Sequence, residues 1–352
     1  MHFCVPRHTH VMSIKFFLIT FFLFLPTESN AQIKTLIAAS SEAPGSTIKD
    51  HFIDFEKTLS KTFDGDINIT LLVNGEAGSE ETSLSALRRG RIHFSAVSVA
   101  AAATAVPELS VLMLPYIFDS DQEADFVLDN FVFSPFQDLF KAKGLTLIRW
   151  LDSGWAVIYG RKPIINPEDA QGYRMRSASA VTAQAFLRAV SADVIPLSFS
   201  DIIPALQTGL IDGGATSPFM FLTGGIFIHA KELTLSRHAL NPGTIIANTA
   251  WLNDLSAQNQ KAVKEAYAPS SLLRADTRRQ TCDAYQTLLG QGVKIHKLSK
   301  QQTAAWQAIV IPTHRKVISE IGGHAELIYD SILEGKAAFA TQDIPHSEKC
   351  NY

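Results

Sequence analysis

The chain has 352 residues, of which 46% are hydrophobic and 18% charged, and its formal net charge is −3. This composition excludes a wholly disordered chain and a collagen-like repeat, and the length predicts two domains or two lobes. The chain has 31 Lys and Arg and 34 Asp and Glu, so it has no excess of basic residues. Nucleic-acid binding through phosphate contacts is therefore not expected. The three cysteines form no Cys-x-x-Cys pair, which excludes a structural zinc site of thiolates.

The N-terminal segment is predicted to be a secretory signal peptide. Residues 16–25 are apolar with one exception, and Lys15 precedes them. This run is too short to span a bilayer. The small residues Ser29 and Ala31 follow it at the spacing of a cleavage site. We therefore expect export and a mature chain that begins near Gln32, with an uncleaved N-terminal anchor as the alternative.

The first part of the mature chain alternates between strand and helix patterns. Strand candidates lie at residues 33–39, 66–73 and 93–97. Apolar residues at helical spacing lie between them, at 46–63 and 83–89. Strand, helix, strand, helix, strand is the order of a parallel sheet with crossover helices.

The same alternation recurs in the middle of the chain. Strand candidates at 155–159, 173–176 and 192–195 accompany helix candidates at 180–190 and 200–208. A second α/β lobe, similar to the first, is therefore predicted.

Two later segments are expected to connect the lobes. Residues 244–247 resemble a strand that returns between them, and residues 256–289 form a long, polar, helix-rich stretch. Pro269 lies inside this stretch and should kink or split the helix. Because the chain has no Pro-rich linker, crossing strands rather than a flexible tether should join the lobes.

The familiar motifs of catalysis are missing from the sequence. It has no GxSxG elbow, no GxxxxGK[ST] phosphate loop and no HExxH pair, and its eleven histidines are scattered singly. Isolated histidines such as His229 and His238 are usually surface or core residues. The protein is therefore not expected to be an enzyme, and no cofactor is expected.

Two cysteines remain once the signal segment, which contains Cys4, is removed. Cys282 and Cys350 would both be exposed to an oxidising compartment after export, and such a compartment allows disulfides to persist. The sequence alone leaves their pairing open.

Four segments resemble motifs of one protein family. They are ALRRGRI at 86–92, PELSVLMLPY at 107–116, PEDAQGYRMR at 167–176 and PALQTGLIDG at 204–213. In this order they resemble the ALRxGxID, PELxVxxLPYxF, PEDLKGLKIR and YxALQTGVVDG motifs of the DctP-like family. Its members are the extracytoplasmic solute-binding proteins of tripartite ATP-independent periplasmic (TRAP) transporters. The resemblance covers roughly residues 33–335.

The resemblance implies an α/β, two-lobed periplasmic-binding-protein fold with crossing strands and a long helix that spans the lobes. A small organic acid would bind in the cleft between the lobes and be delivered to integral membrane subunits of the transporter, without chemistry on the ligand. The expected division is a signal peptide at 1–31, lobe one at 32–153 plus 243–282, lobe two at 154–242 plus 283–340, and a tail at 341–352.

Arg176 is the central residue of the implied site. The family uses the last Arg of the PEDLKGLKIR motif to bind the ligand carboxylate, and a guanidinium fork matches a carboxylate with two charge-assisted hydrogen bonds. Arg174 should point to the same face of the strand, deeper in the sheet or against the other lobe, and Asp212 should hold a turn rather than contact ligand.

The resemblance places further ligand contacts in both lobes. Two of them keep a structural alternative, since Phe199 could be a core residue and Trp155 could be either pocket wall or core. The remaining expected contacts are Ser179, Thr216 and Ser217 in lobe two, and Ser40, Ser41, Glu80 and Ser98 in lobe one.

Two departures from the family pattern bear on the ligand. Ala156 stands where many acid-binding members have a second Arg, and Thr216 and Ser217 replace the usual Glu-Asn pair. A dicarboxylate would bury its second charge without a partner. A monocarboxylate (a 2-oxo, hydroxy or aromatic acid) is therefore predicted over succinate-like diacids or sialic acid, unless another cation such as Arg161 reaches the site.

Two rival functions fit a similar two-lobed scaffold. One is a secreted enzyme, and the other is a sensor subunit that presents its ligand to a membrane receptor. Neighbouring genes for a small and a large integral membrane protein would favour transport over both.

Overall fold

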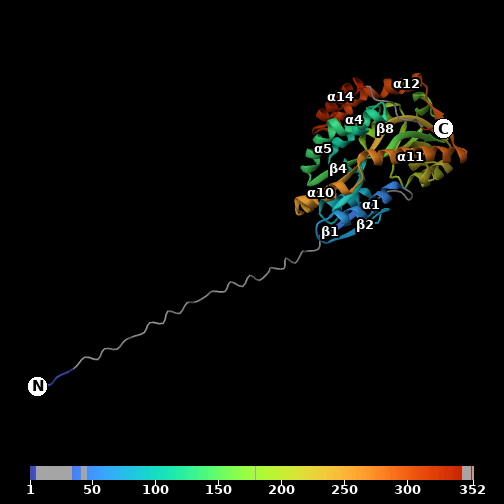
Figure 1. Ribbon diagram of the computed structural model, residues 1–352. Helices are drawn as coiled ribbons and strands as arrows, with labels where there is room; N and C mark the ends of the chain where they lie inside the picture. Colours follow the sequence, from blue (N-terminus) through green and yellow to red (C-terminus); the bar gives the residue numbers. More distant parts are fainter. Residues whose placement is uncertain (5–33, 41–45, 179, 343–349, 351–352) are drawn as a thin grey trace. The chain divides into compact units, whose positions relative to one another are not determined.

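The computed structural model describes residues 1–4, 34–40, 46–178, 180–342 and 350. The chain divides into two compact units, Met1–Gln32 and Ile33–Tyr352, and every helix and strand named below belongs to the second unit (Figure 1). Residues 5–31 of the predicted signal peptide lie outside the described residues, so the export signal stays a prediction.

The strands of the described chain form one mixed sheet in the order β2-β1-β3-β8-β4-β7-β5-β6, with β9 paired to β8. The strands are β1 (Lys34–Ser40), β2 (Ile67–Leu72), β3 (Phe94–Ser98), β4 (Leu145–Gly160), β5 (Arg174–Ser177), β6 (Asp193–Pro196), β7 (Gly213–Thr216), β8 (Glu232–Asn248) and β9 (Lys294–Lys297).

Helices connect these strands and cover both faces of the sheet. They are α1 (Thr47–Thr62), α2 (Glu80–Arg88), α3 (Val99–Ala102), α4 (Asp121–Val127), α5 (Phe133–Lys141), α6 (Val181–Ala189), α7 (Ile202–Thr208), α8 (Pro218–Thr223), α9 (Thr249–Asn253), α10 (Ala257–Ala266), α11 (Ser270–Gly290), α12 (Lys300–Val310), α13 (His314–Ile321) and α14 (Ala325–Ala340). A 3-10 segment, η1 (Pro107–Met113), and a π-helical turn, η2 (Leu128–Val132), complete the elements used below.

The predicted crossovers are confirmed at both ends of the sheet. β1 pairs in parallel with β2 and β3, and β5 pairs in parallel with β6 and β7. The predicted strands at 155–159 and 244–247 are only parts of β4, with 16 residues, and β8, with 17. Nearly every residue of β4 is buried or half-buried. A strand covered on both faces lacks the alternation that marks its length in the sequence.

β4 and β8 join the two ends of the sheet, as expected from the family resemblance. They run antiparallel along most of their length, with a break in register between Asp152 and Trp155. Gly154 lies in that break at a φ of 80°, a left-handed conformation that glycine adopts without steric cost. The two ends, β2-β1-β3 and β7-β5-β6, are thus connected through strands that are irregular at their middle.

Alternate residues of the strands point to opposite faces of the sheet and belong to separate hydrophobic cores. On one face of the first end, Phe52, Phe55 and Phe94 pack with Tyr267, and the Phe55 and Phe94 rings stack at 4.6 Å. The opposite face holds a core around Trp150. The second end has its own pair of cores, one on each face of the sheet. This arrangement is that of two α/β lobes on one continuous sheet.

Pro269 splits the predicted long helix. α10 ends at Ala266, and Pro269 is the N-cap residue of α11 with a φ of −66°. The prediction of a kink or break is therefore confirmed. α11 then contacts β4, near the middle of the sheet, and α8 at its second end.

Cys282 and Cys350 form a disulfide across 68 residues of sequence. Cys282 lies in α11, and Cys350 packs against the core that contains Tyr285 and Leu288 of the same helix. The disulfide therefore fixes residue 350 to α11, which resolves the pairing that the sequence left open.

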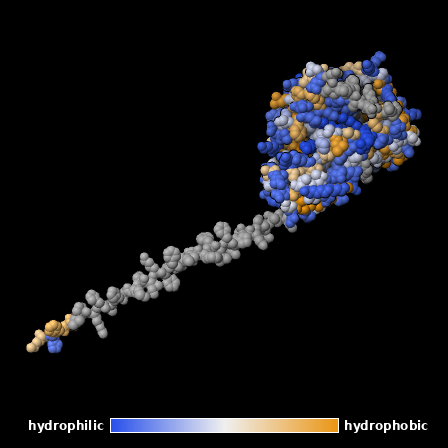
Figure 2. Space-filling model, in the orientation of Figure 1, coloured by the Kyte–Doolittle hydropathy of each residue, from blue (hydrophilic) through white to orange (hydrophobic). Residues whose placement is uncertain are grey.

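Hydrophilic residues cover most of the displayed face of the second unit, and hydrophobic residues lie between them in small groups (Figure 2). Within the described residues, no helix is both long enough and apolar enough to cross a membrane.

Candidate functional site

A cavity of about 430 Å³ lies between the two ends of the sheet. Residues at or just after the carboxyl ends of β3, β5 and β7 line it, together with the middle of β4 and β8 and one side of α11. Ligands of α/β proteins commonly bind at the carboxyl ends of strands, where backbone groups and loop side chains converge. The cavity is therefore the candidate binding site.

Arg176 presents an unpaired positive charge to this cavity. It lies on β5, is only 8% exposed, and donates a hydrogen bond from Nε to the carbonyl oxygen of Leu197 at 3.0 Å. No acidic side chain of the described chain forms an ion pair with it. Burial lowers the pKa of Arg176, although a guanidinium keeps its charge in proteins. Burying a cation without a partner costs free energy, so an anionic ligand group would stabilise this site.

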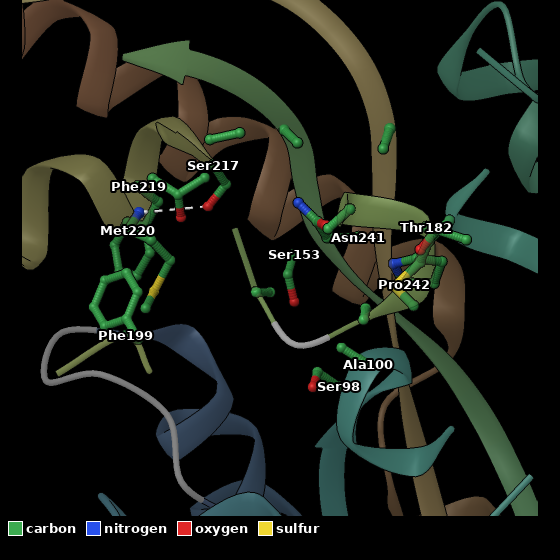
Figure 3. Close-up of a pocket in the computed structure, with 18 of the residues that line it drawn as sticks. Ser98, Ala100, Ser153, Thr182, Phe199, Ser217, Phe219, Met220, Asn241 and Pro242 are labelled. Atoms are coloured by element: carbon green, nitrogen blue, oxygen red, sulfur yellow. Dashed lines mark hydrogen bonds between the residues drawn. The ribbon is translucent and has the colours of Figure 1, made fainter. Parts of the chain in front are cut away.

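An apolar wall lies on one side of the cavity. Figure 3 shows Phe199, Phe219 and Met220 gathered there, beside Ser217. Ser217 is the N-cap residue of α8 and accepts a hydrogen bond from the Met220 backbone N–H at 3.4 Å. Arg176 pairs in register with Gly214 of β7, three residues before Ser217. The cation and the apolar wall therefore belong to the same side of the cavity, called here the Arg176 side.

Ser98 lies across the cavity from Ser217 and Phe219 (Figure 3). It anchors Glu80: the two Glu80 carboxylate oxygens accept hydrogen bonds from the Ser98 backbone N–H and from Ser98 Oγ, each at 2.6 Å. Ser98 Oγ in turn caps α3 by accepting from the Ala101 backbone N–H. Burial raises the pKa of Glu80, and the hydrogen bonds from Ser98 oppose that rise.

Asp152 brings a second carboxylate to the cavity from the break in β4. Its Oδ1 accepts a hydrogen bond from the Gly154 backbone N–H at 2.7 Å, and its Oδ2 lies 3.7 Å from a guanidinium nitrogen of Arg278. Burial raises the pKa of Asp152 to about 6, even though Arg278 and the Gly154 N–H act to lower it. Asp152 was not predicted from the sequence. Its one signal was an acid inside an apolar strand, two residues before a glycine.

His238 also lines the cavity, from β8. Its ring stacks on Phe186 with centroids 4.0 Å apart, and Ser236 Oγ lies 2.8 Å from its Nδ1. Burial lowers the pKa of His238 to about 3, so the ring is neutral at physiological pH. His238 therefore adds hydrogen-bonding capacity to the cavity without adding charge.

The structure brings six of the ten expected contact residues to the cavity. Ser41 and Ser179 lie outside the described residues. The six that line the cavity are Glu80, Ser98, Arg176, Phe199, Thr216 and Ser217.

Trp155 requires a correction, because it does not line the cavity. Successive side chains of a strand point to opposite faces, and its neighbour Ala156 is the one that faces the cavity. Trp155 Nε1 donates to Asp121 at 2.7 Å, and the guanidinium of Arg237 lies over the ring, 4.8 Å from its centroid. The residue belongs to a core, so we leave it out of the proposed site.

Ser40 likewise does not line the cavity, because it is buried at the end of β1. Arg174 was expected deeper in the sheet or against the other lobe. Its side chain is instead exposed and pairs with Asp212 at 2.7 Å. Arg161 donates to the Leu206 carbonyl oxygen and does not reach the cavity either. Among the described lining residues, Arg176 is thus the only Arg or Lys.

Comparison with known proteins agrees with this geometry. The family model described as "Bacterial extracellular solute-binding protein, family 7" matches residues 38–320. The C4-dicarboxylate-binding periplasmic protein DctP of Rhodobacter capsulatus is 26% identical over 289 residues, which cover 81% of this chain and 85% of the relative.

Two solved structures share the fold. The sugar acid binding protein DctPAm from Advenella mimigardefordensis, in complex with galactonate, is 26% identical with a TM-score of 0.78, and the match covers 86% of this chain and 99% of that one. A TRAP periplasmic solute-binding protein from Chromohalobacter salexigens, with bound D-glucuronate, is 22% identical with a TM-score of 0.80 over 85% and 99%.

The family match extends over most of the chain and includes the segments that carry Glu80, Ser98 and Arg176. TRAP solute-binding proteins bind substrates for a transporter and do not transform them. The chain therefore belongs to family 7 of the bacterial extracellular solute-binding proteins, the periplasmic binding subunits of TRAP transporters.

Proposed function

We propose that this protein captures a hydroxylated monocarboxylate in the periplasm and delivers it to the integral membrane subunits of a TRAP transporter. The observation that carries the proposal is the buried Arg176, which faces the cavity without an acidic partner among the described residues. The ligand carboxylate would supply that partner and accept two parallel hydrogen bonds from the guanidinium.

The remaining lining residues suit the body of such a ligand. Phe199 offers an apolar face, and the hydroxyls of Ser98, Thr216 and Ser217 can donate or accept hydrogen bonds. The solved relatives bound to galactonate and D-glucuronate carry ligands of this kind, each with one carboxylate and several hydroxyls. Their ligands support the proposal by analogy.

A C4-dicarboxylate is the second candidate, since the Rhodobacter capsulatus relative is named for that ligand. Against it stands the charge of the cavity, where Arg176 is the only Arg or Lys among the described lining residues. A second carboxylate would be buried without a cation.

Binding is proposed to close the two lobes on the ligand, because residues from both ends of the sheet line the cavity. The lobes would comprise 32–153 plus 243–282, and 154–242 plus 283–340, with a tail at 341–352. The first boundary falls at the break in β4, where the register changes between Asp152 and Trp155. A ligand that contacts both lobes only in the closed state shifts the population toward that state.

The test is titration calorimetry with D-galactonate and D-glucuronate on the wild type and the variants Arg176→Ala and Arg174→Ala. Arg174 is a matched control, because it lies two residues away on β5 but is exposed and paired with Asp212. Arg176→Ala should abolish or strongly weaken binding, and Arg174→Ala should leave it near the wild-type value. Wild-type affinity in Arg176→Ala would contradict the proposal.

A further inference from the structure

The charges that line the cavity are unevenly distributed. Arg176 is its only Arg or Lys among the described residues, whereas two carboxylates, Glu80 and Asp152, also line it. Arg176 pairs with β7 on the Ser217 side. Glu80 is bonded to Ser98, which lies across the cavity from Ser217 (Figure 3). The cavity therefore has a basic side at Arg176 and an acidic side at Glu80. Asp152 lies at the break in β4, where it accepts a hydrogen bond from Gly154, a residue that lies close to Ser217.

Glu80 has hydrogen-bonding capacity left for a ligand. Its carboxylate accepts one bond at each oxygen, both from Ser98, and no Lys, Arg or His of the described chain pairs with it. An ionised carboxylate offers about four lone-pair sites and no donor. The free sites can be filled only by a hydrogen-bond donor.

Asp152 is only weakly compensated by its nearest cation. Arg278 lies 3.7 Å from Asp152 Oδ2, but the same Arg278 nitrogen donates to Asp125 at 2.7 Å. The closer and better hydrogen bond goes to Asp125, which does not line the cavity. Asp152 therefore remains an incompletely compensated, buried carboxylate in the cavity lining, beside Ser153, whose side chain Figure 3 shows among the lining residues.

We propose that Glu80 and Asp152 together determine the ligand class, by accepting hydrogen bonds from a donor group on the end of the ligand away from its carboxylate and by repelling a second carboxylate there. The inference rests on the proposed function, because it assumes that Arg176 holds the first carboxylate. The donor is a hydroxyl or an ammonium group, since both can donate to a carboxylate and neither carries negative charge.

The repulsion has a plain physical origin. Like charges a few ångströms apart in a partly buried site cost far more than they do in water, because the effective dielectric constant is lower. A site built to accept a hydrogen bond also discriminates against an analogue that lacks the donor, because its own polar group is then left unpaired. Acidic residues thus select the ligand in two ways: they repel a second anionic group, and they favour a ligand that donates a hydrogen bond to them.

The test uses acids that differ only at C6. D-galactonate carries a hydroxyl there, its 6-amino-6-deoxy analogue an ammonium, its 6-deoxy analogue a methyl group, and galactarate a second carboxylate. The corresponding gluconate series covers the other C4 configuration. Each acid is titrated by calorimetry into the wild type, Glu80→Gln and Asp152→Asn. Glu81→Gln is the matched control, since this neighbouring acid of α2 is exposed.

The wild type should prefer the C6-hydroxyl or C6-ammonium acid over the diacid by at least about 100-fold. Glu80→Gln and Asp152→Asn should each narrow that ratio by about tenfold, through tighter binding of the diacid, and Glu81→Gln should not. Tighter binding of the ammonium acid than of the hydroxyl acid by the wild type would identify ammonium as the preferred donor. The reverse order would identify the hydroxyl.

Three outcomes would overturn the inference: a wild type that binds the diacid or the methyl analogue as tightly as the hydroxyl acid, a preference unchanged in both acidic-residue variants, or no binding of any hydroxyl or ammonium acid in either series. These outcomes differ from failure of the proposed function. In that case Arg176→Ala would bind as the wild type does, whatever the C6 group.

Discussion

The two sides of the cavity recognise different chemistry. The Arg176 side joins a buried guanidinium to the aromatic side chains of Phe199 and Phe219, whereas the opposite side presents the carboxylate of Glu80, and Asp152 lies at the break in β4. A ligand with one carboxylate and distal donor groups can satisfy both sides in only one orientation. We therefore propose that specificity in this cavity depends on the carboxylate acceptors as much as on the cation that anchors the ligand.

Loss of the guanidinium should have the largest effect. Arg176→Ala removes the only Arg or Lys among the described lining residues, and we expect a loss of about 2–5 kcal/mol in binding free energy, because the ligand charge is left unpaired. Arg176→Lys should recover only part of it, since an ammonium lacks the planar fork. Calorimetry with D-galactonate measures both variants, and equal affinities for Lys and Arg would show that the fork does not matter.

The buried carboxyl of Asp152 should make the stability of the protein depend on pH. Its pKa in the folded protein is about 6, above its ordinary value, so the folded state holds this proton more tightly than the unfolded state. The resulting stabilisation is complete below the ordinary pKa and is lost as pH rises through about 6. The loss amounts to at most about 3 kcal/mol.

Asp152→Asn removes that dependence. Relative to the wild type, the variant should become more stable as pH rises from about 4.5 to about 7.5, as measured by urea unfolding at both values. The charged groups that act on Asp152 are Arg278, Asp121 and Asp125, and all three stay in place in the variant. Parallel pH profiles for variant and wild type would show that burial does not perturb this carboxyl.

The apolar wall should contribute less than the cation. Phe199→Ala removes a ring that packs against Gly224 and faces the cavity. We expect binding to weaken by about 1–2 kcal/mol, through lost apolar contact. Because this contact does not involve charge, the losses for D-galactonate and for its 6-amino-6-deoxy analogue should agree. A loss confined to one of them would place Phe199 at the C6 end instead.

The smallest effect is expected for Ser98→Ala, which keeps the backbone N–H donor to Glu80 but removes the hydroxyl donor. The expected change in binding is about 1 kcal/mol or less, since one of the two hydrogen bonds remains. A competition assay against a fluorescent ligand resolves a change of this size. An effect as large as that of Arg176→Ala would make Ser98 a direct anchor of the ligand.

The sequence predicted contacts on both sides of the cavity, such as Arg176, Ser217 and Glu80, but not the lining residues Asp152 and His238. Arg176 and Ser217 lie in or just after motifs whose order along the chain is specific, and the helices and strands that hold them are short and alternate regularly. Asp152 and His238 lie in β4 and β8, which are buried on both faces and show no periodicity that would tell a cavity residue from a core residue. Their roles depend on how two distant strands cross.

Trp155 illustrates the same limit at the scale of one residue. It is adjacent in sequence to Ala156, which lines the cavity, yet the alternation of the strand sends its ring into a core. The Cys282–Cys350 disulfide joins residues 68 apart and depends on a distance that only the folded chain defines. Pro269, by contrast, acts through its own backbone, so its effect on the helix was predictable.

The identity of the natural ligand tests the proposed function most directly. Protein purified without refolding is denatured, and the released small molecules are identified by mass spectrometry, with Arg176→Ala purified in parallel as the control. We expect a single monocarboxylate with hydroxyl or ammonium groups, present in the wild type and absent from the variant. A dicarboxylate, or a ligand without a carboxylate, in the wild type would contradict the proposed function.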